Sequence, residues 1–242
     1  MKRDYRRWYS ERLGRDMELL IFGHAGAKVL MFPTREGRFF EYEDLRIVAS
    51  LADKVRAGQL QLFCIEGLAR ESFYDTTRPP AARIARHAAL EDYVLHEVMP
   101  LMDGLNPSDC TIAMGCSLGA FQAASLAFRH PHRVRKLVAF SGRYDLTQSV
   151  ECFSDLFDGY YDETIYFHTP LHFLPNLACP WRLESLRRLD IVMTIGDADP
   201  FLDNNLRLSR LLAEKGVDHR LHIWTGRAHR AGAWRQMAPL YV

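Results

Sequence analysis

The chain has 242 residues, enough for one sizeable α/β domain, and its 48% hydrophobic and 25% charged residues are ordinary for a globular protein. Its 31 basic and 30 acidic residues leave a net charge of +1, which argues against a nucleic-acid or polyanion binder. The sequence shows no signal peptide and no apolar run near the ~18 residues of a membrane span, so we expect a cytoplasmic protein that binds no membrane. Its five cysteines are scattered and form no CxxC pair, so we also expect no disulfides.

Hydrophobic patterning predicts a strand hairpin followed by alternating strands and helices. The apolar run Lys28–Phe32, which ends at Pro33, is typical of a strand buried on both faces, as in a parallel sheet. The order predicts the α/β class, with one mixed, mostly parallel sheet, an antiparallel N-terminal hairpin and helices on both faces, in a single domain over residues 1–242. The expected strands are residues 5–10, 17–22, 28–32, 60–65, 110–114, 136–141, 191–195 and 219–224. The expected helices are residues 39–56, 81–101, 120–130 and 203–215, and a short one that contains Trp234 and Met237.

A nucleophile-elbow motif, Gly115-Cys116-Ser117-Leu118-Gly119, lies between one of these strands and the helix that follows it. The G-x-S-x-G pattern is weak by itself, but the strand–turn–helix context is the one in which it has meaning. The flanking glycines suit a turn too crowded for Cβ atoms, and the turn would project the serine Oγ from the end of the strand. Ser117 is therefore the candidate nucleophile, with an ordinary serine in a strand–helix turn as the alternative. Cys116 is expected to point into the core, where a thiol is inert.

The segment of residues 142–181 is the exception to the regular order. It is rich in aromatic residues and is broken by prolines at positions 170, 175 and 180. Loops of this length inside a compact domain are usually functional or carry a small insertion. Two interpretations are open: the segment covers Ser117, or its aromatic side chains only pack an irregular insertion onto the domain.

A serine hydroxyl needs a general base, and the base needs a carboxylate that orients it. In a site built on an elbow the chain order is Ser, then Asp or Glu, then His. His229 is the candidate base because it lies in a loop just past a predicted strand; a solvated loop histidine is the alternative. The other nine histidines are His24, His87, His96, His130, His132, His168, His172, His219 and His222.

Two aspartates compete for the position of the acid. The strand at residues 191–195 ends in Gly196-Asp197-Ala198-Asp199-Pro200. We favour Asp199, because it lies further out in the turn, where its side chain can reach a neighbouring loop, and because Pro200 disfavours helix at Asp199. Asp197 is either the alternative acid or a residue that caps the turn. Asp203 is expected to be the N-cap of the next helix.

An oxyanion hole needs two backbone N–H groups that point at the developing negative charge. One is expected from Leu118, the residue after the nucleophile, at the N-terminus of its helix. The other is expected from the loop Pro33–Gly37, which holds no HGGG run, and we choose Arg35.

Taken together, these residues resemble the α/β-hydrolases of the putative-esterase family, which includes esterase D (S-formylglutathione hydrolase) and the mycobacterial mycolyltransferases. The resemblance implies the α/β-hydrolase fold, a triad of Ser117, Asp199 and His229, and Arg35 as an oxyanion donor. Pro33-Thr34 stands where family members usually have Asp-Gly or Ser-Gly. The resemblance rests on Ser72-Phe73-Tyr74, Glu97-Val98-Met99-Pro100, the Gly115–Gly119 motif, His130-Pro131, Phe140-Ser141-Gly142, Gly196–Pro200, and His229 followed by Trp234.

The leading functional hypothesis is a serine hydrolase that cleaves small-molecule carboxylic esters through an acyl-enzyme on Ser117, with no metal or organic cofactor. If an alcohol instead of water intercepted the acyl-enzyme, the chain would be an acyltransferase. A third hypothesis, from another class, is a catalytically silent, esterase-like binding protein that a fluorophosphonate would not label.

Overall fold

One eight-stranded sheet organises the computed structural model, which describes residues 1–242. The strands run in the order β1-β2-β4-β3-β5-β6-β7-β8. β1 pairs antiparallel with β2, β2 pairs antiparallel with β4, and every other neighbouring pair is parallel. The predicted fold class is therefore confirmed, including the antiparallel hairpin at the edge of the sheet. The bounds are β1 Arg3–Ser10, β2 Arg15–Phe22, β3 Ala27–Phe32, β4 Leu60–Ile65, β5 Thr111–Cys116, β6 Lys136–Phe140, β7 Asp190–Gly196 and β8 Arg220–Trp224.

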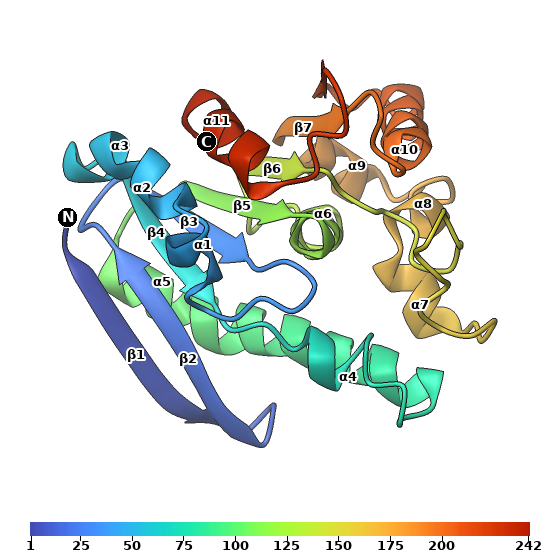
Figure 1. Cartoon of the computed structure of the whole chain (residues 1–242), viewed down its shortest axis with the longest axis horizontal. Helices are drawn as coiled ribbons and strands as arrows, with labels where there is room; N and C mark the ends of the chain where they lie inside the picture. The colour runs from blue at the N-terminus through green and yellow to red at the C-terminus, as the bar shows by residue number, and fades with distance from the viewer.

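Helices cover both faces of the sheet (Figure 1). Helices α1 to α3 and α11 pack on one face, where they bury Tyr42, Ile47, Val55 and Trp234 with the side chains of the strands. Helices α4, α5, α6 and α10 pack on the other face, in the larger core. The bounds are α1 Glu41–Asp44, α2 Ile47–Ser50, α3 Ala52–Arg56, α4 Pro80–Tyr93, α5 Met99–Leu105, α6 Leu118–Arg129, α7 Glu163–His168, α8 Pro170–Phe173, α9 Pro180–Arg187, α10 Leu202–Glu214 and α11 Ala231–Tyr241, with a 3₁₀ turn at Ala69–Glu71 and a π turn at Val94–Val98.

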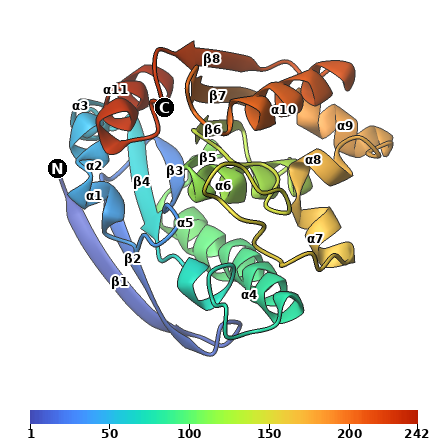
Figure 2. The same cartoon turned by 45° about the vertical axis from the view of Figure 1, so that its right-hand side comes forward.

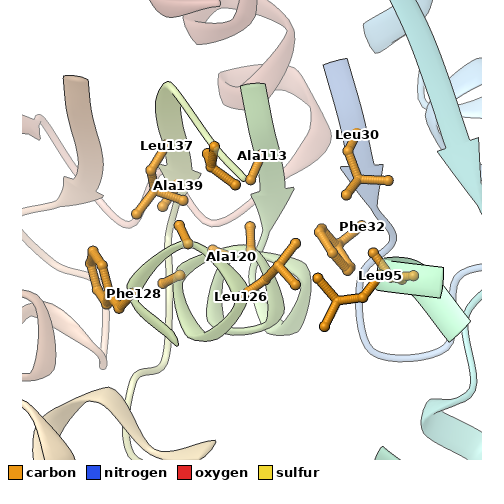
Figure 3. Close-up of a cluster of buried hydrophobic side chains, with 14 of the residues drawn as sticks. Leu30, Phe32, Leu95, Ala113, Ala120, Leu126, Phe128, Leu137 and Ala139 are labelled. Atoms are coloured by element: carbon orange, nitrogen blue, oxygen red, sulfur yellow. The ribbon is translucent and has the colours of Figure 1, made fainter. Parts of the chain in front are cut away.

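Helix α6 is the most central helix, and every residue from Leu118 to Phe128 is buried. Figure 3 shows Ala120, Leu126 and Phe128 of this helix beside side chains of β3, β5 and β6. Small residues at the contact let the helix approach the sheet closely, and close packing resists displacement. The first residue of α6 follows Ser117 directly, so this packing holds the elbow in a fixed position.

Two helical predictions differ from the structure in their details. The expected single helix at residues 39–56 is three short helices, because Arg46 is left-handed (φ 57°) and Leu51 departs from helical geometry. No glycine or proline marks these breaks, so the sequence carries no signal for them. The long helix expected at residues 81–101 runs from Pro80 to Leu105 through the π turn. Pro100 lies just past that turn, and since proline lacks an N–H, the helix loses a regular hydrogen bond there.

The segment of residues 142–181 is less irregular than expected. It contains α7 and α8, and α9 begins at Pro180 near its end. These helices lie together on the side of the molecule away from the hairpin (Figure 2). The expectation for Asp203 was wrong: α10 begins at Leu202 with Phe201 as its N-cap, so Asp203 lies inside the first turn.

All five cysteines are free thiols. None of the helices combines the length and the apolar character that crossing a membrane requires.

Candidate active site

The elbow between β5 and α6 holds Ser117 in a strained conformation, with φ 56° and ψ −120°. Holding a non-glycine residue in this sparsely populated φ/ψ region costs on the order of 1–3 kcal/mol, and such residues cluster at functional sites. The flanking glycines are required, as predicted. A Cβ on Gly115 would lie 2.1 Å from the backbone of Gly119, and a Cβ on Gly119 would lie 2.2 Å from the carbonyl oxygen of Phe32.

Ser117, His229 and Asp199 form a continuous chain of polar contacts. His229 Nε2 lies 3.0 Å from Ser117 Oγ, and His229 Nδ1 lies 2.9 Å from Asp199 Oδ2. A carboxylate only accepts hydrogen bonds, so Nδ1 carries a proton and a neutral ring leaves Nε2 free to accept one. The Asp199 side chain is fully buried and the imidazole is 14% exposed. The geometry is the one that proton transfer from a serine hydroxyl requires.

The two aspartates of the β7 turn do different things. Asp199 Oδ1 accepts the Phe201 N–H at 3.0 Å, which leaves Oδ2 for His229. Asp197 is exposed, and its Oδ1 accepts the Gly226 N–H at 2.6 Å. Asp197 therefore ties the β7 turn to the loop that carries the histidine but does not contact the imidazole.

Aromatic side chains hold the His229 ring from two sides. Its centroid lies 5.9 Å from that of Phe201 and 5.5 Å from that of Trp234. The Trp234 indole donates to Ser141 Oγ at 3.2 Å, and Ser141 itself is left-handed at the end of β6. The histidine is thus positioned by residues that follow β6 and β7 and by α11.

Tyr42, which the sequence did not single out, ties the elbow to the neighbouring strand. Its buried hydroxyl donates to the carbonyl of Phe32 at 2.6 Å and accepts the N–H of Cys116 at 3.0 Å. Burial holds the pKa of this hydroxyl well above its usual range, so it remains a donor. The ends of β3 and β5 are therefore fixed to each other beside Ser117.

Cys116 points into the core, as expected. Its side chain is completely buried, and burial raises the pKa of the thiol. A neutral, buried thiol is a poor nucleophile.

The two expected oxyanion donors belong to different parts of the chain, the start of α6 and the loop after β3. Leu118 opens α6, so its N–H has no acceptor within the helix. Arg35 lies in the loop after β3, and its N–H donates to no protein acceptor. The Arg35 guanidinium lies 4.7 Å from the ring centroid of Tyr74.

Glu41 holds the loop that contains Arg35. Its carboxylate accepts the N–H of Thr34 at 2.7 Å and also the Thr34 hydroxyl. Burial raises the pKa of Glu41, and the hydrogen bonds from Thr34 act in the opposite direction. The carboxylate also packs against Gly37, where a Cβ would lie 2.2 Å from Oε2. Nothing in the sequence pattern distinguishes Glu41 from other acidic residues of this helix.

We expect Glu41→Gln to lower kcat for a short ester by about tenfold with little change in KM, because Glu41 holds the loop of Arg35, the expected oxyanion donor, and a loosened donor would weaken transition-state binding. The amide oxygen can still accept the Thr34 N–H, but the NH₂ group donates to the Thr34 hydroxyl, so both hydrogen bonds lose their charge assistance and the hydroxyl must turn. Glu43→Gln is the matched control on the same helix, since Glu43 pairs only with Arg3 at the surface. Steady-state kinetics of both variants test this, and equal kcat values for the two would contradict a positioning role.

The first part of the 142–181 segment is organised by a buried arginine. Arg143 donates to the carbonyls of Gln148 and Ser154 at 2.6 and 2.8 Å, and its guanidinium lies 5.7 Å from the Phe201 ring centroid. The ring of Phe153 packs against that of Phe201 at a tilt of 54°, with centroids 4.8 Å apart. The segment therefore contacts the aromatic side chain that packs against His229.

A second carboxylate–histidine contact holds the later part of this segment. His172 Nε2 lies 3.1 Å from Asp145 Oδ2, and His172 Nδ1 lies 3.0 Å from the Tyr161 hydroxyl. Burial pushes the pKa of Asp145 upward, but hydrogen bonds from His172 and Thr147 outweigh it and leave that pKa below its usual range. The contact links α8 to the loop after β6.

Fold and site together define a serine hydrolase of the α/β-hydrolase class, with its serine on an elbow and its acid and base after later strands. A model of the family described as putative esterase matches residues 42–237. The chain belongs to this family, and it is a carboxylic ester hydrolase.

Solved structures of esterases share the fold. A ferulic acid esterase superposes with a TM-score of 0.75 at 15% identity, covering 98% of this chain and 94% of that one. An S-formylglutathione hydrolase from Staphylococcus aureus gives a TM-score of 0.72 at 15% identity, with 98% and 94% covered. One from Agrobacterium tumefaciens gives 0.72 at 15% identity, with 98% and 91% covered. A comparison with curated protein sequences finds no match.

Proposed function

We propose that the chain hydrolyses carboxylic esters of small molecules through an acyl-enzyme on Ser117. The observation that carries the proposal is the polar chain from Ser117 through His229 to Asp199 on a strained elbow. Strain of this kind is maintained where the surrounding structure over-determines it, as at active sites.

In the first half of the reaction, Ser117 Oγ attacks the acyl carbon while His229 Nε2 takes the hydroxyl proton. The negative charge that develops on the carbonyl oxygen is stabilised by the N–H groups of Leu118 and Arg35. His229 then gives the proton to the leaving alcohol, and the ester C–O bond breaks. Asp199 stabilises the imidazolium and fixes its orientation.

In the second half, water attacks the acyl-enzyme and His229 takes the proton from that water. Collapse of the second tetrahedral intermediate releases the acid, and the proton returns to Ser117 Oγ. The segment of residues 142–181 covers the site in this proposal, supported by the contact between Phe153 and Phe201 next to His229.

Labelling with a fluorophosphonate tests the proposal. We expect stoichiometric labelling, with the adduct on the peptide that carries Ser117, together with turnover of p-nitrophenyl esters in a series from acetate to palmitate. A folded protein that neither labels nor turns over these esters would contradict the proposal and favour a silent binding protein.

We expect Asp199→Asn to lower kcat by about 10⁴-fold. The Phe201 N–H would hold the amide oxygen, as it now holds Oδ1 of the aspartate, and the amide NH₂ would then face His229 Nδ1. His229 would be forced into the tautomer with a proton on Nε2, which cannot accept the proton of Ser117.

Asp197→Asn is the matched control, because an asparagine oxygen can still accept the Gly226 N–H. Its kcat is expected to stay within a few-fold of wild type. Kinetics of the two variants decide between the aspartates, and a larger loss for the Asp197 variant would reverse their assignment.

A further inference from the structure

Arg143 carries a positive charge into the protein without a carboxylate partner. The residue is only 5% exposed, yet no carboxylate oxygen lies within 4.0 Å of its guanidinium nitrogens. Arg83, the other buried arginine, pairs with Asp158. Buried charges are ordinarily paired, so the Arg143 guanidinium has room for an anionic partner that the chain itself does not supply.

The guanidinium uses only part of its hydrogen-bonding capacity within the protein. Nε and Nη2 donate to main-chain carbonyls of residues 145–154, with the shortest distances to Gln148 and Ser154, at 2.6 and 2.8 Å. The other amino group, Nη1, donates to no acceptor in the protein, and it does not belong to the unpartnered polar atoms that are closed off from solvent. Nη1 therefore keeps its N–H groups free and open to solvent.

The position of Arg143 relates it to the nucleophile and the base. The Ser117 N–H donates to the carbonyl of Phe140 at 2.8 Å, and Arg143 follows Phe140 by three residues, so its Cα lies within about 11 Å of that of Phe140. The guanidinium carbon lies 5.7 Å from the ring centroid of Phe201, the same ring that packs against His229. Arg143 thus leaves β6 beside the elbow and contacts the ring that holds the base.

Tyr74 relates the same guanidinium to the expected oxyanion hole. The Arg35 guanidinium lies over the Tyr74 ring, which also packs against the apolar cluster that contains Leu118. Burial raises the pKa of Tyr74, and the charges of Arg35 and Arg143 oppose that rise, so both guanidinium groups act on one hydroxyl. This hydroxyl has no hydrogen-bond partner in the protein and is not closed off from solvent. Arg143 and Tyr74 therefore offer neighbouring free donors beside residues of the candidate site.

The carboxylates nearest to Arg143 are engaged elsewhere. Asp145 contacts His172, and Asp155 accepts two backbone N–H groups of its own loop. Burial lowers the pKa of Arg143, and Tyr74 opposes this effect more than Asp145 or Asp155 does. The positive charge beside the Tyr74 hydroxyl is therefore left for a ligand.

We infer that Arg143 Nη1 and the Tyr74 hydroxyl bind a carboxylate carried by the ester substrate. The inference rests on the proposed function and adds a substrate class to it, namely esters with a carboxylate at a distance from the scissile bond. A carboxylate only accepts hydrogen bonds, and a guanidinium and a phenol both donate them. Such bonds are charge-assisted and therefore stronger than bonds between neutral groups.

The test compares two pairs of esters whose members differ in one group, a carboxylate or the primary amide of similar shape. The acyl pair is monophenyl adipate and phenyl 6-amino-6-oxohexanoate. The alcohol pair is the butyrate esters of 3-(4-hydroxyphenyl)propionate and 3-(4-hydroxyphenyl)propanamide. In at least one pair we expect kcat/KM to be about tenfold or more higher for the carboxylate at low ionic strength, and the preference to shrink as salt screens the charges. The pair that shows the preference identifies the part of the substrate that carries the carboxylate.

Two variants test the residues, with the ratio of carboxylate to amide kcat/KM as the measurement. Tyr74→Phe removes a hydroxyl that makes no hydrogen bond in the folded protein, and it should lower the ratio by about tenfold. Arg143→Gln removes the charge and should abolish the preference. Thermal unfolding checks that each variant is folded, and Tyr74→Phe decides the test if Arg143→Gln is not.

The matched controls are Tyr160→Phe and Arg188→Gln. Tyr160 binds Asp162 at the surface, and Arg188 pairs only with Glu184. Three results would overturn the inference alone: no higher kcat/KM for the carboxylate in either pair, a preference unchanged in Tyr74→Phe or in folded Arg143→Gln, or an equal loss in the controls. Absence of turnover for all four esters would contradict the proposed function itself.

Discussion

Ser117→Ala is expected to lower kcat for ester hydrolysis by about 10⁶-fold, while the protein remains folded. The variant loses the only hydroxyl that lies 3.0 Å from His229 Nε2. Alanine has the same backbone preferences as serine at φ 56°, so the strain of the elbow is unchanged and the melting temperature should move by only a few degrees.

Ser125→Ala is the matched control. Ser125 lies two turns further along α6, and its buried hydroxyl has no hydrogen-bond partner, so its loss should leave turnover at the wild-type level. A Ser117→Ala protein that kept more than about a tenth of the wild-type rate would contradict the assignment and direct attention to the neighbouring Cys116.

The arrangement of strands could be predicted because each strand carries its own local signal. Apolar runs such as Lys28–Phe32 and Ile191–Ile195 are buried strands of a parallel sheet, and the hairpin lies where a turn around Gly14 separates the first two expected strands. The three helices between residues 41 and 56 could not be predicted, because the chain leaves helical geometry at Arg46 and Leu51, where no glycine or proline signals a break.

The candidate site could be predicted where function demands unusual local chemistry. Positions 115 and 119 require glycine because a Cβ at either would lie within 2.2 Å of backbone atoms. The sequence shows this requirement as the G-x-S-x-G motif. Chain order then pointed to His229 and Asp199, since polar side chains after parallel strands meet at one edge of the sheet. The structure brings these two residues and Ser117 into contact.

The residues that support the site are not marked by any comparable motif in the sequence. Glu41 and Tyr42 act on groups outside their own helix, namely Thr34, Phe32 and Cys116. An acidic residue and a tyrosine in a short helix look ordinary until the fold brings them to the loop and the strand end. Positioning contacts of this kind are part of a catalytic site, because they hold the reacting groups in place before the substrate arrives.

His229→Ala is expected to lower ester turnover almost as far as Ser117→Ala does, because nucleophile and base act as a unit. The sharper measurement is the rate of labelling by a fluorophosphonate, which depends on activation of Ser117 by its base. With His229 absent, Ser117 Oγ retains no general base at 3.0 Å, and labelling should slow by at least about 10³-fold.

His222→Ala is the control for this experiment. His222 lies in β8, where its ring stacks on Tyr241 with centroids 4.6 Å apart, and it makes no hydrogen bond with Ser117. Its variant should label at the wild-type rate, although loss of the stacking contact lowers stability by about 1 kcal/mol. A His229→Ala protein that labelled as fast as His222→Ala would contradict the assignment of His229 and leave the elbow serine without an identified base.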